Sequence, residues 1–307
     1  MTKKMLGLLA FLGLSFVAMA QTPYKTSFAI RIKGEESNYT IFSVFVMPGE
    51  RLTLSSTAPL RLTGPDIGIR EETTMAWQLT CPPEPGAYKL TLRHDNGEVA
   101  TLNVLVLTPI TDMEGEYLGK YRIGNYPTTP LRGNPIYLPP KGLFMLTDDL
   151  LSLKLTPHFT LKQFQCKQGE DRYPKYLLVR ERLLLKLEYL LEVAQEEGYD
   201  IETFGFISGY RTPHYNQAIG NVKYSRHVYG GAADIIIDQN RDGNMDDLNQ
   251  DGKVDENDVR LFYNLVERQV KKERYAAQFI GGLGFYKRNN RHHGFIHVDV
   301  RGTAARW

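Results

Sequence analysis

The chain contains 307 residues, with 37 Lys and Arg against 35 Asp and Glu and a formal net charge of +2. This balance gives no indication of nucleic-acid binding, which is typical of proteins with excess positive charge. After the first twenty residues no run is apolar enough to cross a bilayer, so we expect no membrane-spanning segment.

Residues 1–20 have the pattern of an export signal. Lys3 and Lys4 precede a short apolar run at 6–17, and Ala18-Met19-Ala20 provides the small residues of a cleavage site. The run is too short for a spanning helix, and no cysteine follows it that would carry a lipid. We therefore expect a periplasmic or secreted protein, and the roughly 285 residues that remain are enough for two domains.

Residues 21–107 are predicted to be all-β. Segments rich in β-branched and aromatic residues alternate with turn sequences. These segments are 26–33, 39–47, 52–55, 75–79, 87–94 and 98–107. Asp95-Asn96-Gly97 between the last two is a strong hairpin signal. Six or seven short strands over this length suggest an immunoglobulin-like β-sandwich. We interpret it as a spacer or as a module that binds an envelope polymer or protein, because it contains no ligand cluster.

Residues 108–146 are rich in Pro, Gly and Tyr and form a predicted inter-domain linker, whose aromatic content argues against free flexibility. The second domain, 147–307, is predicted to be α+β. A helix is expected over 174–197, with Pro174 in its first turn and Gly198 at its C-terminal cap. The other predicted elements are a helix at 259–277 and strands at 201–207, 232–238, 282–286 and 295–300.

The only two cysteines, Cys81 and Cys166, fall in different predicted domains. In an oxidising compartment they could form an inter-domain disulfide. Two separately buried thiols are the alternative, which the sequence favours.

Two histidines and one aspartate are candidates for a metal site. His227 and Asp234 are seven residues apart, and His297 lies on a separate predicted strand. Asp234 begins an apolar strand, where a carboxylate is costly to bury unless a salt bridge or a metal ion compensates its charge. Two imidazoles and one carboxylate leave a fourth position open on zinc, which is the ligand number of a catalytic site.

Four motifs surround these residues. They are Ser208-Gly209-Tyr210-Arg211-Thr212-Pro213, Ser225-Arg226-His227 with Gly230 and Ala233-Asp234, Gly284-Phe285-Tyr286, and His297-Val298-Asp299-Val300. Over roughly residues 156–307 the chain resembles the zinc D-Ala-D-Ala metallopeptidases, which are cell-wall carboxypeptidases and endopeptidases that share a zinc fold with the hedgehog domain. The resemblance implies a zinc DD-peptidase fold, zinc held by His227, Asp234 and His297, and peptidoglycan stem peptides as substrates.

The resemblance also implies two catalytic residues. In the carboxypeptidase branch an arginine lies sixteen residues before the first zinc histidine, which is Arg211, and a catalytic histidine lies five before the last ligand, which is His292. The dipeptidase branch instead has a glutamate at the position of Gly294. The histidine version is therefore favoured, and spacing alone separates His292 from His293. His292 would transfer a proton.

Arg211 would bind a terminal carboxylate or an oxyanion; the alternative is a surface arginine that follows a turn. Ser208 and Tyr210 are interpreted as residues that shape the loop. Asp299, which alternates with His297 on one strand face, is interpreted as a supporting residue. No Gly-x-Ser-x-Gly sequence indicates a serine nucleophile.

The sequence therefore predicts a secreted zinc metallopeptidase that acts on D-amino-acid bonds of peptidoglycan. The tail at 301–307 also resembles that of cell-wall endopeptidases in the family, so carboxypeptidase and endopeptidase both stay open. The alternative is a non-catalytic envelope-binding protein that keeps zinc and calcium as scaffolding.

An acidic insertion, residues 238–258, lies between Asp234 and His297. Its second half resembles an EF-hand or dockerin-type calcium loop with its sharp turn at Gly252. The ligands predicted there are Asp247, Asn249, Asp251, the Lys253 carbonyl, Asp255 and Asp258. The first half begins the same pattern with Asp238, Asn240 and Asp242. An acidic, solvated loop is the alternative. As a hypothesis, calcium orders the insertion and so supports the zinc site indirectly.

Overall fold

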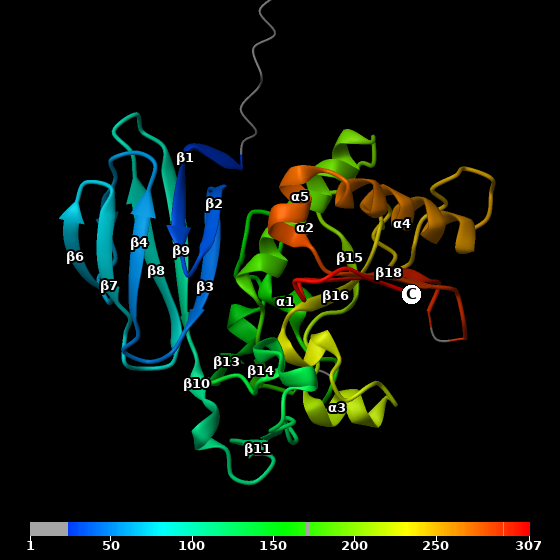
Figure 1. Ribbon diagram of the computed structural model, residues 1–307, viewed down its shortest axis with the longest axis horizontal. Helices are drawn as coiled ribbons and strands as arrows, with labels where there is room; N and C mark the ends of the chain where they lie inside the picture. The colour runs from blue at the N-terminus through cyan, green and yellow to red at the C-terminus, as the bar shows by residue number, and fades with distance from the viewer. Residues whose placement is uncertain (1–23, 170–171, 291) are drawn as a thin grey trace, which may run out of the picture.

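The computed structural model describes residues 24–169, 172–290 and 292–307. The predicted export signal at 1–20 lies outside these residues. Within the described ranges, no helix combines the length and the apolar character needed to cross a membrane. Figure 1 shows a β-rich N-terminal part, in blue and cyan, beside a C-terminal part in green to red that contains helices α1 to α5.

The N-terminal part consists of two sheets, with the strand orders β2-β1-β4-β7-β6 and β3-β9-β8-β5. Its strands are β1 (Lys25–Ile32), β2 (Glu35–Tyr39), β3 (Ile41–Val46), β4 (Arg51–Ser56), β5 (Arg61–Thr63), β6 (Gly68–Thr73), β7 (Ala76–Thr80), β8 (Gly86–Arg93) and β9 (Val99–Val106). Buried residues from both sheets, such as Leu54, Trp77 and Leu102, belong to the hydrophobic core. The arrangement agrees with an all-β N-terminal part; its immunoglobulin-like type stays a prediction.

The hairpin predicted at Asp95-Asn96-Gly97 joins β8 to β9, which pair antiparallel from Arg93↔Val99 onward. The sequence missed β2, β5 and β6; the segment predicted at 39–47 corresponds to β3 and overlaps β2 only at Tyr39. Five of the six residues of β6 are exposed and three are charged, so it has no alternation of apolar and polar residues that would indicate a strand. The pairing of β6 with β7, which no local pattern reveals, makes it one.

Residues 108–146 fold against the C-terminal part. Strands β10 (Thr108–Pro109) and β13 (Gly142–Leu146) form a three-stranded sheet with β14 (Lys175–Leu177), and β11 (Tyr117–Leu118) pairs with β12 (Tyr121–Arg122). Short 3-10 helices lie at η1 (Ile110–Asp112), η2 (Leu131–Gly133), η3 (Pro135–Tyr137), η4 (Asp148–Leu150) and, further on, η5 (Arg226–Tyr229). The Tyr126 hydroxyl lies 2.7 Å from that of Tyr210. The segment is therefore packed at its aromatic side chains.

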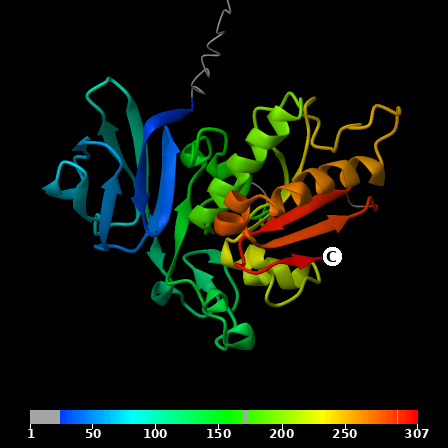
Figure 2. The same ribbon diagram turned by 45° about the horizontal axis from the view of Figure 1, so that its top comes forward.

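The C-terminal part is built on a five-stranded sheet with the order β15-β16-β18-β17-β19. The strands are β15 (Gly205–Ser208), β16 (Ala232–Ile236), β17 (Gly282–Tyr286), β18 (Phe295–Asp299) and β19 (Ala305–Arg306). The helices are α1 (Leu161–Phe164), α2 (Glu181–Glu196), α3 (Pro213–Ala218), α4 (Glu256–Val270) and α5 (Glu273–Phe279). In Figure 1, α4 and α5 lie on one side of this sheet and α3 on the other, and Figure 2 shows α4 running along the sheet.

The helix predicted over 174–197 begins later, at Glu181, and Pro174 is not in its first turn. Residues 175–177 instead form β14, which pairs with β13. A tertiary pairing overrides the helical spacing of Leu177 with the leucines that follow. The end of the helix is as predicted, because Gly198 has a φ of 96°, the left-handed conformation that glycine adopts after a helix.

The helix predicted over 259–277 is two helices, α4 and α5, separated at 271–272. The change of direction brings the rings of Tyr275 and Phe279 to 5.8 and 5.6 Å from the ring of Tyr189 on α2. Burial of these aromatic rings against α2 accounts for the break.

Glu181 at the start of α2 joins the two parts of the chain. Its carboxylate accepts a hydrogen bond from the backbone of Phe45 at 3.0 Å and one from Lys33 at 2.9 Å. Cys81 and Cys166 are both free and buried, so the inter-domain disulfide is not formed. Burial raises the pKa of the Cys81 thiol to about 11.

Candidate metal centre and active site

A row of paired residues crosses four neighbouring strands of the C-terminal sheet. Ser208 on β15 pairs with Asp234 on β16, Asp234 pairs with His297 on β18, and His297 pairs with Gly284 on β17. Directly paired residues place their side chains on the same face of a sheet. Strand register, with an irregularity between Phe206 and Ser208 on β15, therefore brings Ser208, Asp234 and His297 together.

His227 comes from the short helix η5, which ends at Gly230 with a φ of 67°. A Cβ atom on Gly230 would lie 2.4 Å from the carbonyl oxygen of Leu178. Only glycine fits this close approach in the left-handed conformation. Gly230 therefore sets where the η5 turn, and with it His227, lies against the sheet.

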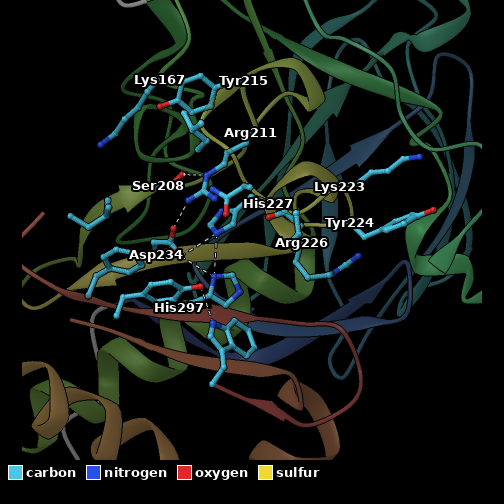
Figure 3. Close-up of a pocket in the computed structure, with 18 of the residues that line it drawn as sticks. Lys167, Ser208, Arg211, Tyr215, Lys223, Tyr224, Arg226, His227, Asp234 and His297 are labelled. Atoms are coloured by element: carbon cyan, nitrogen blue, oxygen red, sulfur yellow. Dashed lines mark hydrogen bonds and ion pairs between the residues drawn. The ribbon is translucent and has the colours of Figure 1, made fainter. Parts of the chain in front are cut away.

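The side chains of His227, Asp234 and His297 converge on one point (Figure 3). The Asp234 Oδ1 atom lies 3.1 Å from His227 Nε2 and 2.8 Å from His297 Nδ1, and the two nitrogens are 3.2 Å apart. All three side chains are buried. Among the described residues this is the only group of three or more His, Cys, Asp and Glu side chains whose ligand atoms all lie within 4.8 Å of one another.

The opposite ring nitrogens of both histidines face fixed acceptors. His227 Nδ1 lies 2.6 Å from the carbonyl oxygen of Gly209, and His297 Nε2 lies 3.2 Å from Asp299 Oδ2. A neutral imidazole carries one hydrogen, so each ring donates outward and presents a lone pair to the centre. Three acceptor atoms then face one another without a donor between them. A cation resolves this repulsion, and outward hydrogen bonds of this kind orient histidine ligands in metal sites.

The titration of Asp234 and His227 is consistent with a metal site. Burial opposes ionisation of Asp234, but the two imidazoles hold its pKa well below the usual range. Burial lowers the pKa of His227, which favours the neutral ring that binds a metal. Burial also acts to lower the pKa of His297, but its hydrogen bonds to Asp234 and Asp299 raise it on balance. The set fits zinc, which binds nitrogen and carboxylate ligands.

Asp299 is buried beneath His297 and is held from several directions. Its carboxylate accepts hydrogen bonds from the backbone of Gly282 at 2.8 Å and from the Nε of Arg301 at 2.9 Å. Burial opposes its ionisation, but His297 and Arg301 hold its pKa well below the usual range. Asp299 therefore remains an anion that orients His297.

Arg211 lies at the β15 end of the row. Its Nε donates a hydrogen bond to the Ser208 hydroxyl at 2.8 Å, and its guanidinium pairs with the second oxygen of Asp234. Arg211 and Ser208 both line the cavity above the centre. Tyr210, the third residue predicted in this loop, is not among the described residues that line the cavity. Its buried hydroxyl instead forms a hydrogen bond with the hydroxyl of Tyr126, which holds the loop against residues 108–146.

A cavity of about 930 Å³ opens above the centre. His292 lines it together with His227, Asp234 and His297, whereas His293 lines two neighbouring hollows. The Nε2 atom of His292 lies 2.7 Å from the side-chain nitrogen of Asn289. Burial lowers the pKa of His292, so its ring is neutral at neutral pH.

The cavity also contains residues that the sequence did not single out. Lys167 lies near Arg211, the predicted linker contributes Leu131 and Tyr137, and Trp307 lies next to His297. One signal was available: glycines inside a strand, such as Gly284 in β17, often mark the close approach of another group. No local sequence pattern predicts that residues 108–146 line the cavity, because their position there depends on how that segment folds back.

The acidic insertion folds around the first aspartate of each half. The Asp238 carboxylate accepts from the backbone of Asp242 at 3.0 Å and of Gly243 at 2.9 Å, and the Asp247 carboxylate accepts from Asp251 at 3.2 Å and from Gly252 at 2.7 Å. Each half therefore makes the same turn. The neighbouring amides Asn240 and Asn249 lie 3.4 and 3.0 Å from a carboxylate oxygen two residues on.

Asp258, predicted as the twelfth calcium ligand, caps α4. Its carboxylate accepts from the backbone of Leu248 at 2.7 Å and of Asp255 at 2.8 Å, and Asp255 completes a capping box. The carboxylates of the insertion do not gather into a group like that of His227, Asp234 and His297. Calcium binding by this segment, including the Lys253 carbonyl, stays a prediction.

Residues 155–264 match the family model described as Peptidase M15. The matched range contains Arg211, His227 and Asp234 and ends before His292 and His297. It covers less than half of the chain. The match supports a zinc-dependent metallopeptidase of the D-Ala-D-Ala peptidase type, and the cluster of His227, Asp234 and His297 is a group that could bind the metal.

No curated protein matches the chain. Three similar solved structures are a nucleoside hydrolase-related hypothetical protein from Saccharophagus degradans associated with carbohydrate metabolism, the BIgI domain of the beta protein from S. agalactiae bound to CEACAM1, and SGBP-B of the Bacteroides ovatus mixed-linkage glucan utilization locus in complex with a mixed-linkage heptasaccharide.

Their sequence identities to this chain are 10%, 15% and 14%, and their TM-scores are 0.20, 0.18 and 0.14. The matches cover 27%, 26% and 28% of this chain, and the chain spans 25%, 95% and 38% of theirs. At TM-scores this low, none of these likenesses bears on the fold or the function.

Proposed function

We propose that the protein is a secreted zinc metallopeptidase that hydrolyses D-amino-acid peptide bonds in peptidoglycan stem peptides, as a DD-carboxypeptidase or an endopeptidase. One observation carries the proposal: three buried ligand atoms of His227, Asp234 and His297 converge beneath a large cavity in a group that could hold a metal ion. The match of residues 155–264 to Peptidase M15 supports the reaction class.

His227, Asp234 and His297 would hold the zinc ion. When bound, zinc supplies a Lewis acid that makes water a nucleophile at neutral pH. The Gly209 carbonyl and the Asp299 carboxylate keep the two imidazoles turned toward the ion. With three protein ligands, zinc keeps a position open toward the cavity, as a catalytic rather than a structural site requires.

His292 is the proton-transfer residue of the proposal. It lines the same cavity, and its ring is neutral at neutral pH, so it accepts a proton and can return it to the leaving amine. Its hydrogen bond with Asn289 limits the orientation of the ring.

Arg211 binds the negative charge of the substrate. Its Nε is fixed by Ser208 and its guanidinium lines the cavity at one end of the row of ligands. A guanidinium held in this way suits a terminal carboxylate or an oxyanion that develops during attack.

The decisive experiment is digestion of intact sacculi and of purified muropeptides, followed by mass analysis of the fragments. Zinc-loaded protein should release products whose masses identify a cut at a D-amino-acid bond, and a zinc chelator should abolish them. Loss of a terminal residue identifies a carboxypeptidase, and loss of a cross-link identifies an endopeptidase. Binding to sacculi without any chelator-sensitive product would support the non-catalytic envelope-binding protein instead.

The remaining parts of the proposal concern the rest of the chain. Residues 1–20 direct export to the periplasm or the medium, and residues 21–107 form a sandwich that binds an envelope polymer or protein. Calcium, bound by the insertion at 238–258, orders the start of α4. A physical link to the site exists, because a Cβ atom on Gly294 would lie 2.7 Å from the Val259 side chain on α4. The insertion therefore supports the turn that carries His292.

A further inference from the structure

The row of paired residues at the metal centre ends at a strand position without a side chain. Gly284 on β17 pairs with His297, and a Cβ atom on Gly284 would lie 2.6 Å from the indole of Trp307. The indole therefore fills the space that a side chain at position 284 would occupy. Its ring centroid is 5.1 Å from that of the His297 imidazole. Trp307 thus completes the row Ser208, Asp234, His297 on the same face of the sheet.

Several contacts fix the orientation of this indole. The Trp307 carbonyl accepts from the backbone of Phe285 at 2.8 Å, and its Nε1 donates to the Tyr286 hydroxyl at 2.8 Å. The guanidinium of Arg301 lies 5.1 Å from the ring. A side chain held on three sides loses little further conformational entropy when a ligand binds.

Trp307 is nevertheless 45% exposed, and it lines the cavity above the metal centre. The stacked rings of Tyr286 and Phe295, 4.6 Å apart, line the cavity beside it. A fixed aromatic surface that faces a cavity is the usual apolar component of a ligand site. The Arg301 guanidinium is paired with Asp299 through both Nε and a terminal nitrogen, whereas Arg211 contacts Asp234 through one terminal nitrogen only.

We propose that the Trp307 indole contacts the substrate residue on the side of the metal centre opposite Arg211. This inference rests on the proposed function. Across the sheet the order is Arg211 with Ser208, then Asp234, then His297, then Trp307. A peptide whose scissile bond lies at the centre extends toward Arg211 on one side and toward Trp307 on the other.

The two ends of the row differ in chemistry, which defines the substrate class. The guanidinium of Arg211 selects an anionic group, such as the carboxylate of the leaving residue. The indole selects an uncharged, apolar surface, such as the methyl group of the residue whose carbonyl carbon is attacked. Trp307 is therefore a specificity-determining residue for the amino acid on the N-terminal side of the scissile bond.

The chain offers a direct probe, because its only tryptophans are Trp77 and Trp307. Trp77 lies in the N-terminal core with 1% exposure and serves as an internal reference. In zinc-loaded protein that contains 5-fluorotryptophan, the fluorine resonance of Trp307, assigned with Trp307→Phe, should shift when diacetyl-L-Lys-D-Ala-D-Ala is added. The resonance of Trp77 should not shift.

Kinetics test the specificity. For the same peptide, Trp307→Ala should raise KM about tenfold, which equals about 1.4 kcal/mol. It should also reduce the preference over a peptide with D-Glu in place of the central D-Ala, and Trp307→Phe should restore most of both effects. Zinc content and melting temperature measured in parallel show whether either variant acts only through the fold of the tail.

The outcomes separate this inference from the proposed function. If the wild type hydrolyses the peptide but Trp307→Ala has unchanged KM and unchanged preference, the inference is overturned and the proposed function stands. A shift of the Trp307 resonance without hydrolysis keeps the contact and rejects the function. No hydrolysis and no shift rejects both. Loss of zinc in Trp307→Phe would assign the indole a structural role and overturn the inference.

Discussion

The Nδ1 atom of His297 lies 2.8 Å from Oδ1 of Asp234, and the two residues are direct partners on the antiparallel strands β18 and β16. The geometry of the metal centre therefore depends on strand register. A slip of one residue would turn both side chains to the opposite face. Two ligands far apart in the sequence are thus fixed by the same backbone hydrogen bonds that hold the sheet together.

The Asp299 carboxylate should control the affinity for zinc, because it fixes the His297 ring from behind. We expect Asp299→Asn to weaken zinc binding about 10- to 100-fold, the usual effect of removing such a partner. Competition with a chromophoric chelator measures this constant. Asp112→Asn, at an exposed aspartate far from the centre in sequence, is the matched control. Equal zinc affinity in the two variants would show that Asp299 does not orient the ligand.

The neighbouring histidines His292 and His293 should differ in their effect on catalysis. Removal of a general acid-base residue lowers kcat by about 10²- to 10⁴-fold, so we expect a loss in this range for His292→Ala. His293→Ala, whose side chain lines other hollows, should retain near wild-type kcat. Elemental analysis must show the same zinc content in both variants. A large loss in His293→Ala with none in His292→Ala would reverse the assignment.

The pH dependence of kcat/KM should report His292. A base must be deprotonated, and burial lowers the pKa of His292 below the ordinary value of 6.5. Activity should therefore be full at neutral pH and fall as the pH drops through this lowered pKa. The Asp234 charge raises the pKa of His292, and bound zinc offsets that charge, so the zinc-loaded enzyme should titrate still lower. The profile of His292→Ala should lack this limb; an unchanged limb would assign it to another group.

Calcium should stabilise the insertion and act on the site through α4. Removal with a calcium-selective chelator should lower the melting temperature and raise KM, because the Asp255 and Asp258 cap of α4 lies directly after the loop. Asp251→Ala should behave like the chelated protein, and Asp112→Asn should not. Zinc content must be followed in the same samples. If neither the melting temperature nor the activity changes when calcium is removed, the segment is an acidic, solvated loop and not a calcium site.

How far the sequence predicted the fold depended on how local each signal was. Strand β17 occurs at the predicted residues, and the Asp95-Asn96-Gly97 turn joins two strands, because alternation and turn chemistry are local. Residues 175–177 were predicted to be helical but form β14, which pairs with β13. The sequence could not predict this pairing, because β13 is distant in sequence. Strand β6 had no alternation of apolar and polar residues from which a strand could be predicted.

The candidate site shows the same division. Residue types and spacing indicated His227, Asp234 and His297, and the family resemblance added Arg211. The structure brings these four residues together. They could not indicate the Gly209 carbonyl, because any residue has one. Nor could they indicate Tyr137 or Trp307, whose places in the cavity depend on a segment that folds back and on a tail that lies over two glycines of β17.

The most direct test of the account is the zinc content of the purified full-length protein, measured by elemental analysis after removal of loosely bound metal. We expect one zinc ion per chain in the wild type. The variants His227→Ala, Asp234→Ala and His297→Ala should each lose it, and His293→Ala should keep it. A folded wild-type protein that binds no zinc, or that keeps it after the loss of these side chains, would contradict the central claim.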